Sequence, residues 1–166
     1  MIYEYGLFNE FKTLSEIQYE KLKDDLKYSQ QEESFRLNIN EYNFINKVSC
    51  YVVNSTFACE IALKAILKFN QILKRNYTNE VLKKHRLDDL FDLLDDIQQE
   101  IILSKLPLLK NKEELKKELK IIANNFVEWR YSFQTNKMKG EQNNLTTNVV
   151  FIKDFLNALD KFLIDL

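Results

Sequence analysis

The chain of 166 residues contains few of the residues that interrupt helices or build common active sites: two glycines, one proline, two cysteines and one histidine. An all-β protein needs many more turn-forming residues than these, so the composition argues against that class. With 45% hydrophobic and 30% charged residues, the chain is long enough to fill one core. We therefore expect one all-α domain over residues 1–166, an antiparallel bundle of four to five helices with one long central helix.

The two cysteines and the nearly neutral charge argue against a metal site and against a protein that is attracted as a whole to nucleic acid or membranes. Cys50 and Cys59 lie nine residues apart in an apolar context without a Cys-x-x-Cys spacing, which is typical of buried small residues. We expect neither a metal site nor a cofactor. The net charge is −1 and the pI is near 6.0, so nothing global attracts nucleic acid or an anionic membrane. No basic start leads into an apolar segment, and no continuous run of about 18 apolar residues occurs, so we expect a cytoplasmic protein without membrane contact.

Apolar residues recur in steps of three and four along five stretches of the chain. They predict helices over residues 7–28, 41–75, 87–105, 111–133 and 147–165. The stripe of the central helix has small residues in its middle, which allow a neighbouring helix to approach closely; it consists of Phe44, Val48, Tyr51, Ser55, Cys59, Ala62, Ile66, Phe69 and Leu73. The helix over residues 87–105 has Leu87, Leu90, Leu94, Ile97 and Ile101 on one face, and the last helix has Ile152, Phe155, Leu159 and Phe162. The last helix continues to Leu166 without a polar tail, so this chain or a partner must cover its end.

Glu60 and Lys64 lie four residues apart on one side of the central helix. A solvated surface pair of this kind is common and contributes about 0.3 to 0.5 kcal/mol. The apolar residues around this pair, such as Phe57 and Leu67, instead favour a half-buried carboxylate that needs a cation. Lys64 or a residue of another helix would provide that cation.

His85 lies in the densest basic run of the chain, with Lys83, Lys84 and Arg86. One interpretation is a polar residue at a helix start that caps or stacks, because no second histidine is present as an acid or base counterpart. The other is a contact of this basic patch with phosphate, although six acidic residues between Asp88 and Glu100 limit a long nucleic-acid track.

Arg130 lies among aromatic residues in the segment Phe126-Val127-Glu128-Trp129-Arg130-Tyr131-Ser132-Phe133. It would stack on Trp129 or Tyr131, pair with Glu60 across the bundle, or bind phosphate. The residues alone leave a structural ion pair and a phosphate site equally open.

Three segments in this order resemble the HEPN superfamily of small helical-bundle proteins. They are Phe57-Ala58-Cys59-Glu60-Ile61-Ala62-Leu63-Lys64-Ala65-Ile66-Leu67, then His85-Arg86-Leu87-Asp88-Asp89-Leu90-Phe91, then Phe126-Val127-Glu128-Trp129-Arg130-Tyr131. The resemblance covers roughly residues 40–135. It implies an antiparallel bundle, often dimeric, of the kind found in prokaryotic toxin–antitoxin, phage-defence and nucleotidyltransferase-associated systems.

Many members of that superfamily are metal-independent endoribonucleases whose signature is an arginine followed by four to six residues and a histidine. The chain departs from that signature, because Thr135, Asn136 and Lys137 stand where the histidine belongs and Tyr131 replaces the polar residue after the arginine. Without a general acid or base at that place, cleavage is not the first expectation.

We therefore expect a HEPN-like, non-catalytic binding or regulatory module of a defence, toxin–antitoxin or stress system. In this interpretation Glu60, Lys64, His85 and Arg130 form a polar network that stabilises the bundle or holds the phosphate of RNA or a nucleotide. The module would act as a homodimer or with a cognate partner protein. The alternatives are an endoribonuclease that uses Arg130 with His85 or Tyr131, and a structural helical subunit.

Overall fold

The computed structural model describes residues 2–27, 42–74, 83–131 and 147–166, which are mostly helical and contain no strand. This confirms the all-α class. The helices of these residues are α1 (Ile2–Lys27), α2 (Tyr42–Lys74), α3 (Leu87–Phe91), α4 (Asp96–Ser104), α5 (Lys112–Ile122), α6 (Asn125–Tyr131) and α7 (Val149–Ile164).

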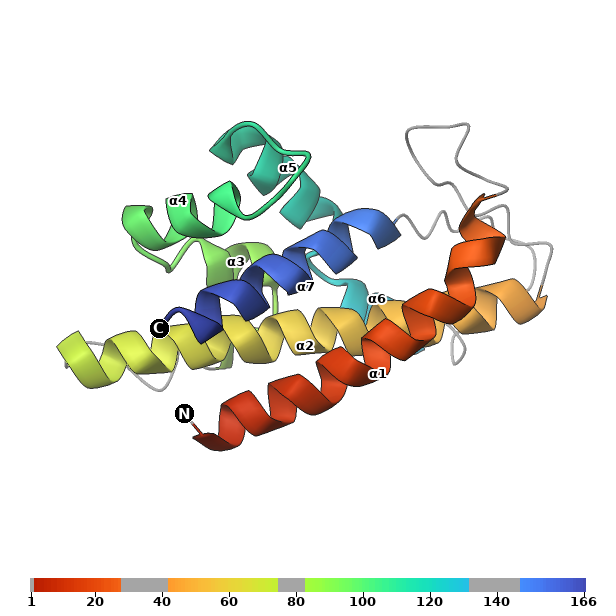
Figure 1. The fold of residues 1–166 in the computed structure, drawn as a ribbon, viewed down its shortest axis with the longest axis horizontal. Coiled ribbons are helices and arrows are strands. Elements are labelled where there is room, and N and C mark those ends of the chain that lie inside the picture. Colours follow the sequence, from red (N-terminus) through yellow and green to blue (C-terminus); the bar gives the residue numbers. More distant parts are fainter. Residues whose placement is uncertain (1, 28–41, 75–82, 132–146) are drawn as a thin grey trace.

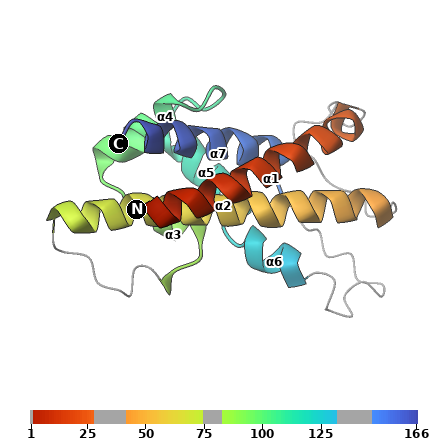
Figure 2. The ribbon, with the colours of Figure 1, turned by 60° about the horizontal axis from the view of Figure 1, so that its bottom comes forward.

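The long helix α2 is the centre of the fold, and α1, α3, α6 and α7 all pack against it. Figure 1 shows α1 running along α2 in the opposite direction, whereas α7 crosses above α2 and runs in the same direction. Helices α4 and α5 lie outside α7 and α3, away from α1. Figure 2 shows α6 on the side of α2 opposite to α7.

The middle of the predicted stripe of α2 is buried, and Phe69 near its end is half-buried. Every member from Val48 to Ile66 is at most 1% exposed, including the small residues Ser55, Cys59 and Ala62. The small residues therefore lie where neighbouring helices meet α2, as predicted. Cys59 is buried as expected, but the prediction was wrong for Cys50, which is exposed.

The single helix predicted over residues 87–105 is wrong, because the chain turns between α3 and α4. Asp95 accepts a hydrogen bond from the backbone N–H of Gln98, and the Gln98 side chain accepts one from the N–H of Asp95, so the two form a capping box. The side-chain amide of Gln99 donates to the carbonyl oxygens of Phe91 and Leu94 at 3.2 and 3.1 Å. The turn thus satisfies backbone groups that a helix end leaves open.

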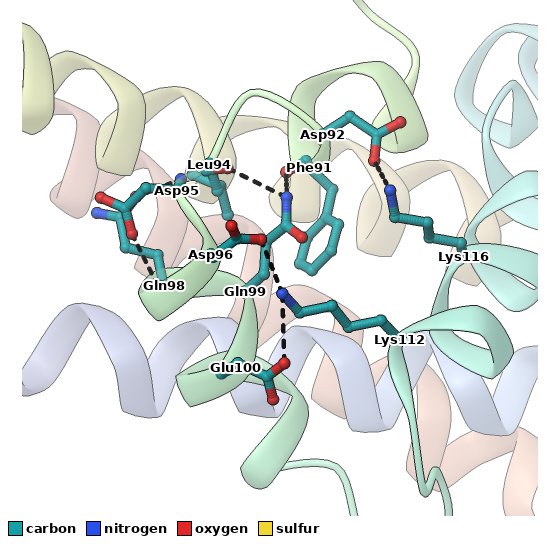
Figure 3. A network of polar contacts seen from close by, with 10 residues as sticks. All are labelled: Phe91, Asp92, Leu94, Asp95, Asp96, Gln98, Gln99, Glu100, Lys112 and Lys116. Atoms are coloured by element: carbon teal, nitrogen blue, oxygen red, sulfur yellow. Dashed lines mark hydrogen bonds and ion pairs between the residues drawn. The ribbon is translucent and has the colours of Figure 1, made fainter.

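Lysines of α5 hold this turn from the outside (Figure 3). The Lys116 ammonium lies 2.7 Å from Asp92, and that of Lys112 lies 2.9 Å from Asp96 and 3.2 Å from Glu100. These exposed pairs add little stability individually, but they connect α5 to both sides of the break.

The break also changes which side chains of α4 face the core. Ile97 and Ile101 were predicted to continue the apolar face of Leu87, Leu90 and Leu94, yet Ile97 is 73% exposed and Ile101 is 40% exposed. In their place α4 buries Ile102 and Leu103, together with the amides of Gln98 and Gln99.

A second break divides the helix predicted over residues 111–133, whose last two residues lie outside the described part. Helix α5 ends at Ile122, where the carbonyl of Ala123 accepts a hydrogen bond from the N–H of Leu87. Asn125 begins α6, and its buried side chain donates to Thr147 at 2.7 Å, just before α7. The break therefore anchors the start of α3 and the start of α7 in the same region.

Helix α7 begins at a cap formed by Asn148, whose side chain accepts from the N–H of Phe151. Its predicted apolar residues are all buried: Ile152, Phe155, Leu159 and Phe162. The chain itself covers Phe162, while Ile164 and Leu166 remain 65% and 44% exposed.

Candidate functional site

The site begins with a carboxylate in the middle of α2. Glu60 is only 3% exposed, because the apolar residues around it on α2 belong to the core. One turn later, the Nζ atom of Lys64 lies 2.7 Å from Oε1 of Glu60. This pair is partly buried rather than solvated, as the apolar surroundings predicted.

The same carboxylate oxygen accepts a second contact from His85, whose Nδ1 atom lies 2.9 Å from Oε1 of Glu60. Leu87 holds this segment against the bundle, because its side chain is buried and its N–H donates to the carbonyl of Ala123. The imidazole itself is 63% exposed. His85 is therefore fixed at one ring nitrogen while most of the ring faces solvent.

The second oxygen of the carboxylate, Oε2 of Glu60, is buried and has no hydrogen-bond partner among the described residues. Lys64 and His85 thus meet at one atom, so the ammonium and the imidazole are neighbours. The ammonium of Lys64 donates to Oε1 of Glu60, and Nδ1 of His85 meets the same atom.

The residues beside His85 place positive charge at the surface. Lys83, Lys84 and Arg86 are all exposed. The guanidinium of Arg86 forms two hydrogen bonds with Asp88, at 3.1 and 2.7 Å, and this contact raises the pKa of Arg86. Among the described residues, Lys83 and Lys84 have no such carboxylate partner. The unbalanced charge of the patch therefore comes mainly from these two lysines.

Arg130 lies on α6, in contact with an aromatic ring that the sequence interpretation did not select. Its guanidinium carbon is 5.6 Å from the centre of the Phe126 ring, and Phe126 stacks on Phe57 of α2 at 4.9 Å. The spacing of four residues between Phe126 and Arg130 was the available signal. Arg130 is exposed, whereas Trp129 is 1% exposed.

The four predicted network residues thus fall into two groups. The structure brings Lys64 and His85 to Glu60, and it places Arg130 over the Phe126 ring, which stacks on Phe57. Phe57 and Glu60 are three residues apart on α2, so the two groups contact α2 within one helical turn. Tyr131 ends α6, and its side chain lies outside the described part, as do Thr135, Asn136 and Lys137.

No metal cluster is present among the described residues, and the pocket that they form lies elsewhere in the fold. Within the described ranges, no group of three or more histidine, cysteine or acidic side chains is arranged to hold a metal. A pocket of about 260 Å³ lies between α1, α2 and α7, and its lining includes Tyr19, Tyr51 and Lys153. Tyr51 precedes Glu60 by nine residues on α2, so this pocket is separate from the His85 site.

One segment of α2, Lys47–Asn70, is long and apolar enough to cross a membrane by length and composition alone. In this structure 72% of the most apolar window is buried inside the protein. A core helix that neighbouring helices cover has the same composition, so the finding is weak evidence for a membrane span.

Comparisons with known proteins found no match, so the site is interpreted from its own geometry. No protein-family model matches the sequence, and no curated protein and no solved structure matches the chain.

Proposed function

We propose that this protein is a HEPN-like, non-catalytic binding module that holds the phosphates of single-stranded RNA at the basic patch Lys83–Arg86. The observation that carries the proposal is the buried Glu60 carboxylate, which fixes the exposed His85 inside a run of exposed cations. A histidine that only stabilised the bundle would not need two exposed lysines beside it, neither of which has a carboxylate partner among the described residues.

The charges of the patch favour phosphate over a carboxylate-bearing protein partner. Arg86 already binds Asp88 through two hydrogen bonds, whereas Lys83 and Lys84 have no carboxylate partner within the described ranges. Lysine ammonium groups bind phosphate as point charges, without the planar geometry that arginine uses for carboxylates. Two adjacent lysines suit successive phosphates of a flexible strand.

The exposed face near Arg130 supports a single-stranded ligand. Arg130 lies over Phe126 of α6, Phe126 stacks on Phe57 of α2, and the guanidinium offers an exposed planar group. Bases of single strands stack on aromatic and guanidinium planes, and such stacking tolerates any sequence. We propose that the module acts in the cytoplasm, in a defence, toxin–antitoxin or stress system, as a homodimer or with a cognate protein.

Fluorescence anisotropy with a labelled single-stranded RNA tests the proposal. We expect a dissociation constant in the micromolar range that rises with salt, because a few phosphate contacts carry the affinity. The double variant Lys83→Ala/Lys84→Ala should weaken binding at least tenfold and flatten the salt dependence. A matched control, Lys117→Ala/Lys120→Ala, removes the same charge from exposed positions of α5 and should change little. Equal losses in both variants would contradict a specific patch.

A second candidate, a metal-independent endoribonuclease, is favoured by one observation. A carboxylate that orients the Nδ1 side of a histidine leaves Nε2 in the position of a general base or acid. Incubation of the purified protein with total RNA and transfer RNA, without metal, beside His85→Ala and Arg130→Ala variants, separates the two functions. Cleavage that either substitution abolishes would replace the binding proposal.

A further inference from the structure

The pocket between α1, α2 and α7 is a separate place where a ligand could bind. Helices α1 and α7 both pack on α2, while they make few contacts with each other. The pocket between them has a volume of about 260 Å³, whereas sites for drug-sized ligands have roughly 300–1,000 Å³. It therefore suits a smaller molecule, of roughly ten to fifteen non-hydrogen atoms.

Two tyrosine rings and a leucine form the apolar part of this pocket. The ring centres of Tyr19 on α1 and Tyr51 on α2 are 5.6 Å apart, and Leu156 of α7 also lines the space. The hydroxyl of Tyr51 donates to the carbonyl of Val149 at 3.3 Å, which fixes this buried ring. Aromatic rings of this kind provide a large apolar contact area, so they favour a ligand with an apolar side chain.

The cation of the pocket belongs to α7. The Nζ atom of Lys153 lies 4.5 Å from the centre of the Tyr19 ring, and among the described residues it has no ion pair. Asn157 lies one turn later and also lines the pocket, and its side-chain amide has no hydrogen-bond partner in the described part of the chain. An ammonium group and an amide N–H₂ group that face the same space suit a carboxylate.

The carboxylates of the pocket belong to α1. Glu16 and Glu20 are one turn apart, and both line the space. The Lys12 ammonium lies 2.8 Å from Glu16 and 3.2 Å from Asp160 of α7, so one positive charge serves two carboxylates. The α1 side of the pocket therefore keeps negative charge, which suits the ammonium group of a ligand.

We propose that this pocket binds a small zwitterion with an apolar side chain, the chemical class of an apolar α-amino acid. The ligand carboxylate contacts Lys153 and Asn157, its ammonium group faces the carboxylates of α1, and its side chain packs on the tyrosine rings. A simple anion leaves the α1 carboxylates without a cation, and a simple amine leaves Lys153 without an anion. The proposal is independent of phosphate binding at Lys83–Arg86, because the pocket is separate from that patch.

NMR titration of the amide resonances with L-phenylalanine and L-leucine tests the proposal. We expect a dissociation constant on the order of 1 mM, as for other ligands of about a dozen atoms. The amides that shift should be those of the pocket residues and not those around His85. 3-Phenylpropionate lacks the ammonium group, 2-phenylethylamine lacks the carboxylate and glycine lacks the side chain, so each should bind at least fivefold more weakly than L-phenylalanine.

Two variants locate the two charges. Lys153→Met keeps an apolar stem over Tyr19 but removes the ammonium group, and it should bind L-phenylalanine about tenfold more weakly, the effect of one charged hydrogen bond. Its control, Lys161→Met, removes a charge from an exposed position of α7 and should bind like the unmodified protein. Glu20→Gln should weaken binding several-fold, whereas Glu10→Gln, at an exposed position of α1, should not.

Three results would overturn the proposal. The first is that neither amino acid shifts the amides of the pocket. The second is that 3-phenylpropionate or 2-phenylethylamine binds as tightly as L-phenylalanine, since a zwitterion would then have no advantage. The third is that Lys153→Met, with an unchanged fold by circular dichroism, binds L-phenylalanine as tightly as the unmodified protein.

Discussion

Glu60 and His85 are 25 residues apart in the sequence, and a 2.9 Å contact between Oε1 and Nδ1 joins them in the fold. Because Lys64 donates to the same oxygen, one buried carboxylate connects the centre of α2 to the exposed basic patch. Glu60 is thus a buried residue that positions an exposed one. The contribution of this contact to the free energy of unfolding can be measured without any ligand.

Glu60→Gln is expected to reduce the free energy of unfolding by about 1–3 kcal/mol, the usual effect of leaving buried hydrogen-bonding groups poorly matched. A neutral amide accepts less strongly from Lys64 and His85, and it would place an N–H₂ group in the buried position that Oε2 now occupies. Urea denaturation followed by circular dichroism measures the loss. Glu113→Gln, at an exposed position of α5, is the control and should unfold like the unmodified protein. If both variants have unchanged stability, the carboxylate does not support the fold.

The buried amides of Asn70 and Gln98 are expected to behave as one unit. Each donates to the other at 2.9 Å, which connects the C-terminal part of α2 to α4. Asn70→Leu leaves the Gln98 amide without this partner and should cost about 1–3 kcal/mol, as should Gln98→Leu. The double variant should cost less than the sum of the single variants, with a coupling of at least about 0.5 kcal/mol in urea denaturation. Strictly additive losses would contradict a shared interaction.

Much of this fold follows from apolar periodicity, and the exceptions have local causes. The stripe of α2 and that of α7 were predicted residue by residue, because one uninterrupted helix keeps a constant phase. The breaks before α4 and α6 were missed because side-chain hydrogen bonds, and not glycine or proline, make them. Gln99, for example, satisfies two carbonyl oxygens that no sequence pattern links to it.

Contacts within one helix of the candidate site could be predicted from the sequence, whereas contacts between separate segments could not. The spacing of four residues identifies the Glu60–Lys64 pair, since both lie on one helix. The approach of His85 depends on where the segment before α3 is anchored, and the N–H of Leu87 reaches Ala123 only in the folded chain. Arg130 was expected on Trp129 or Tyr131; its guanidinium lies over Phe126, Trp129 is buried, and the side chain of Tyr131 lies outside the described part.

The ion pair of Glu4 with Lys68 is expected to make stability depend on pH. The hydrogen bond from the Lys68 ammonium lowers the pKa of Glu4 from 4.5 to about 2. A carboxyl with a lowered pKa in the folded state stabilises the protein above its unfolded value, and this contribution is lost as the pH falls from about 4.5 to about 2. Solvent screens the pair, because Lys68 is 42% exposed, so the contribution is about 1 kcal/mol.

Glu4→Gln isolates that contribution. The variant should be about 1 kcal/mol less stable than the unmodified protein at neutral pH, and the difference should vanish near the lower end of the same pH range. Urea denaturation of both proteins across that pH range measures the difference in their free energies of unfolding. The contributions of the other carboxyl groups cancel in this difference, because both proteins contain them. A difference that stays constant with pH would show that Glu4 acts through packing and not through its charge.

The two cysteines are expected to differ in reactivity because α2 places them in different surroundings. Cys59 is completely buried, and burial raises the pKa of its thiol, so the thiolate that attacks an alkylating reagent is scarcely present. Cys50 lies nine residues earlier on the same helix and is exposed. Iodoacetamide should therefore add one group to the folded protein and two groups in urea, as intact-mass spectrometry can count. Cys50→Ser should leave the folded protein unmodified, whereas alkylation of Cys59 in that variant at the rate of a free thiol would mean that the interface of α2 with its neighbours opens readily.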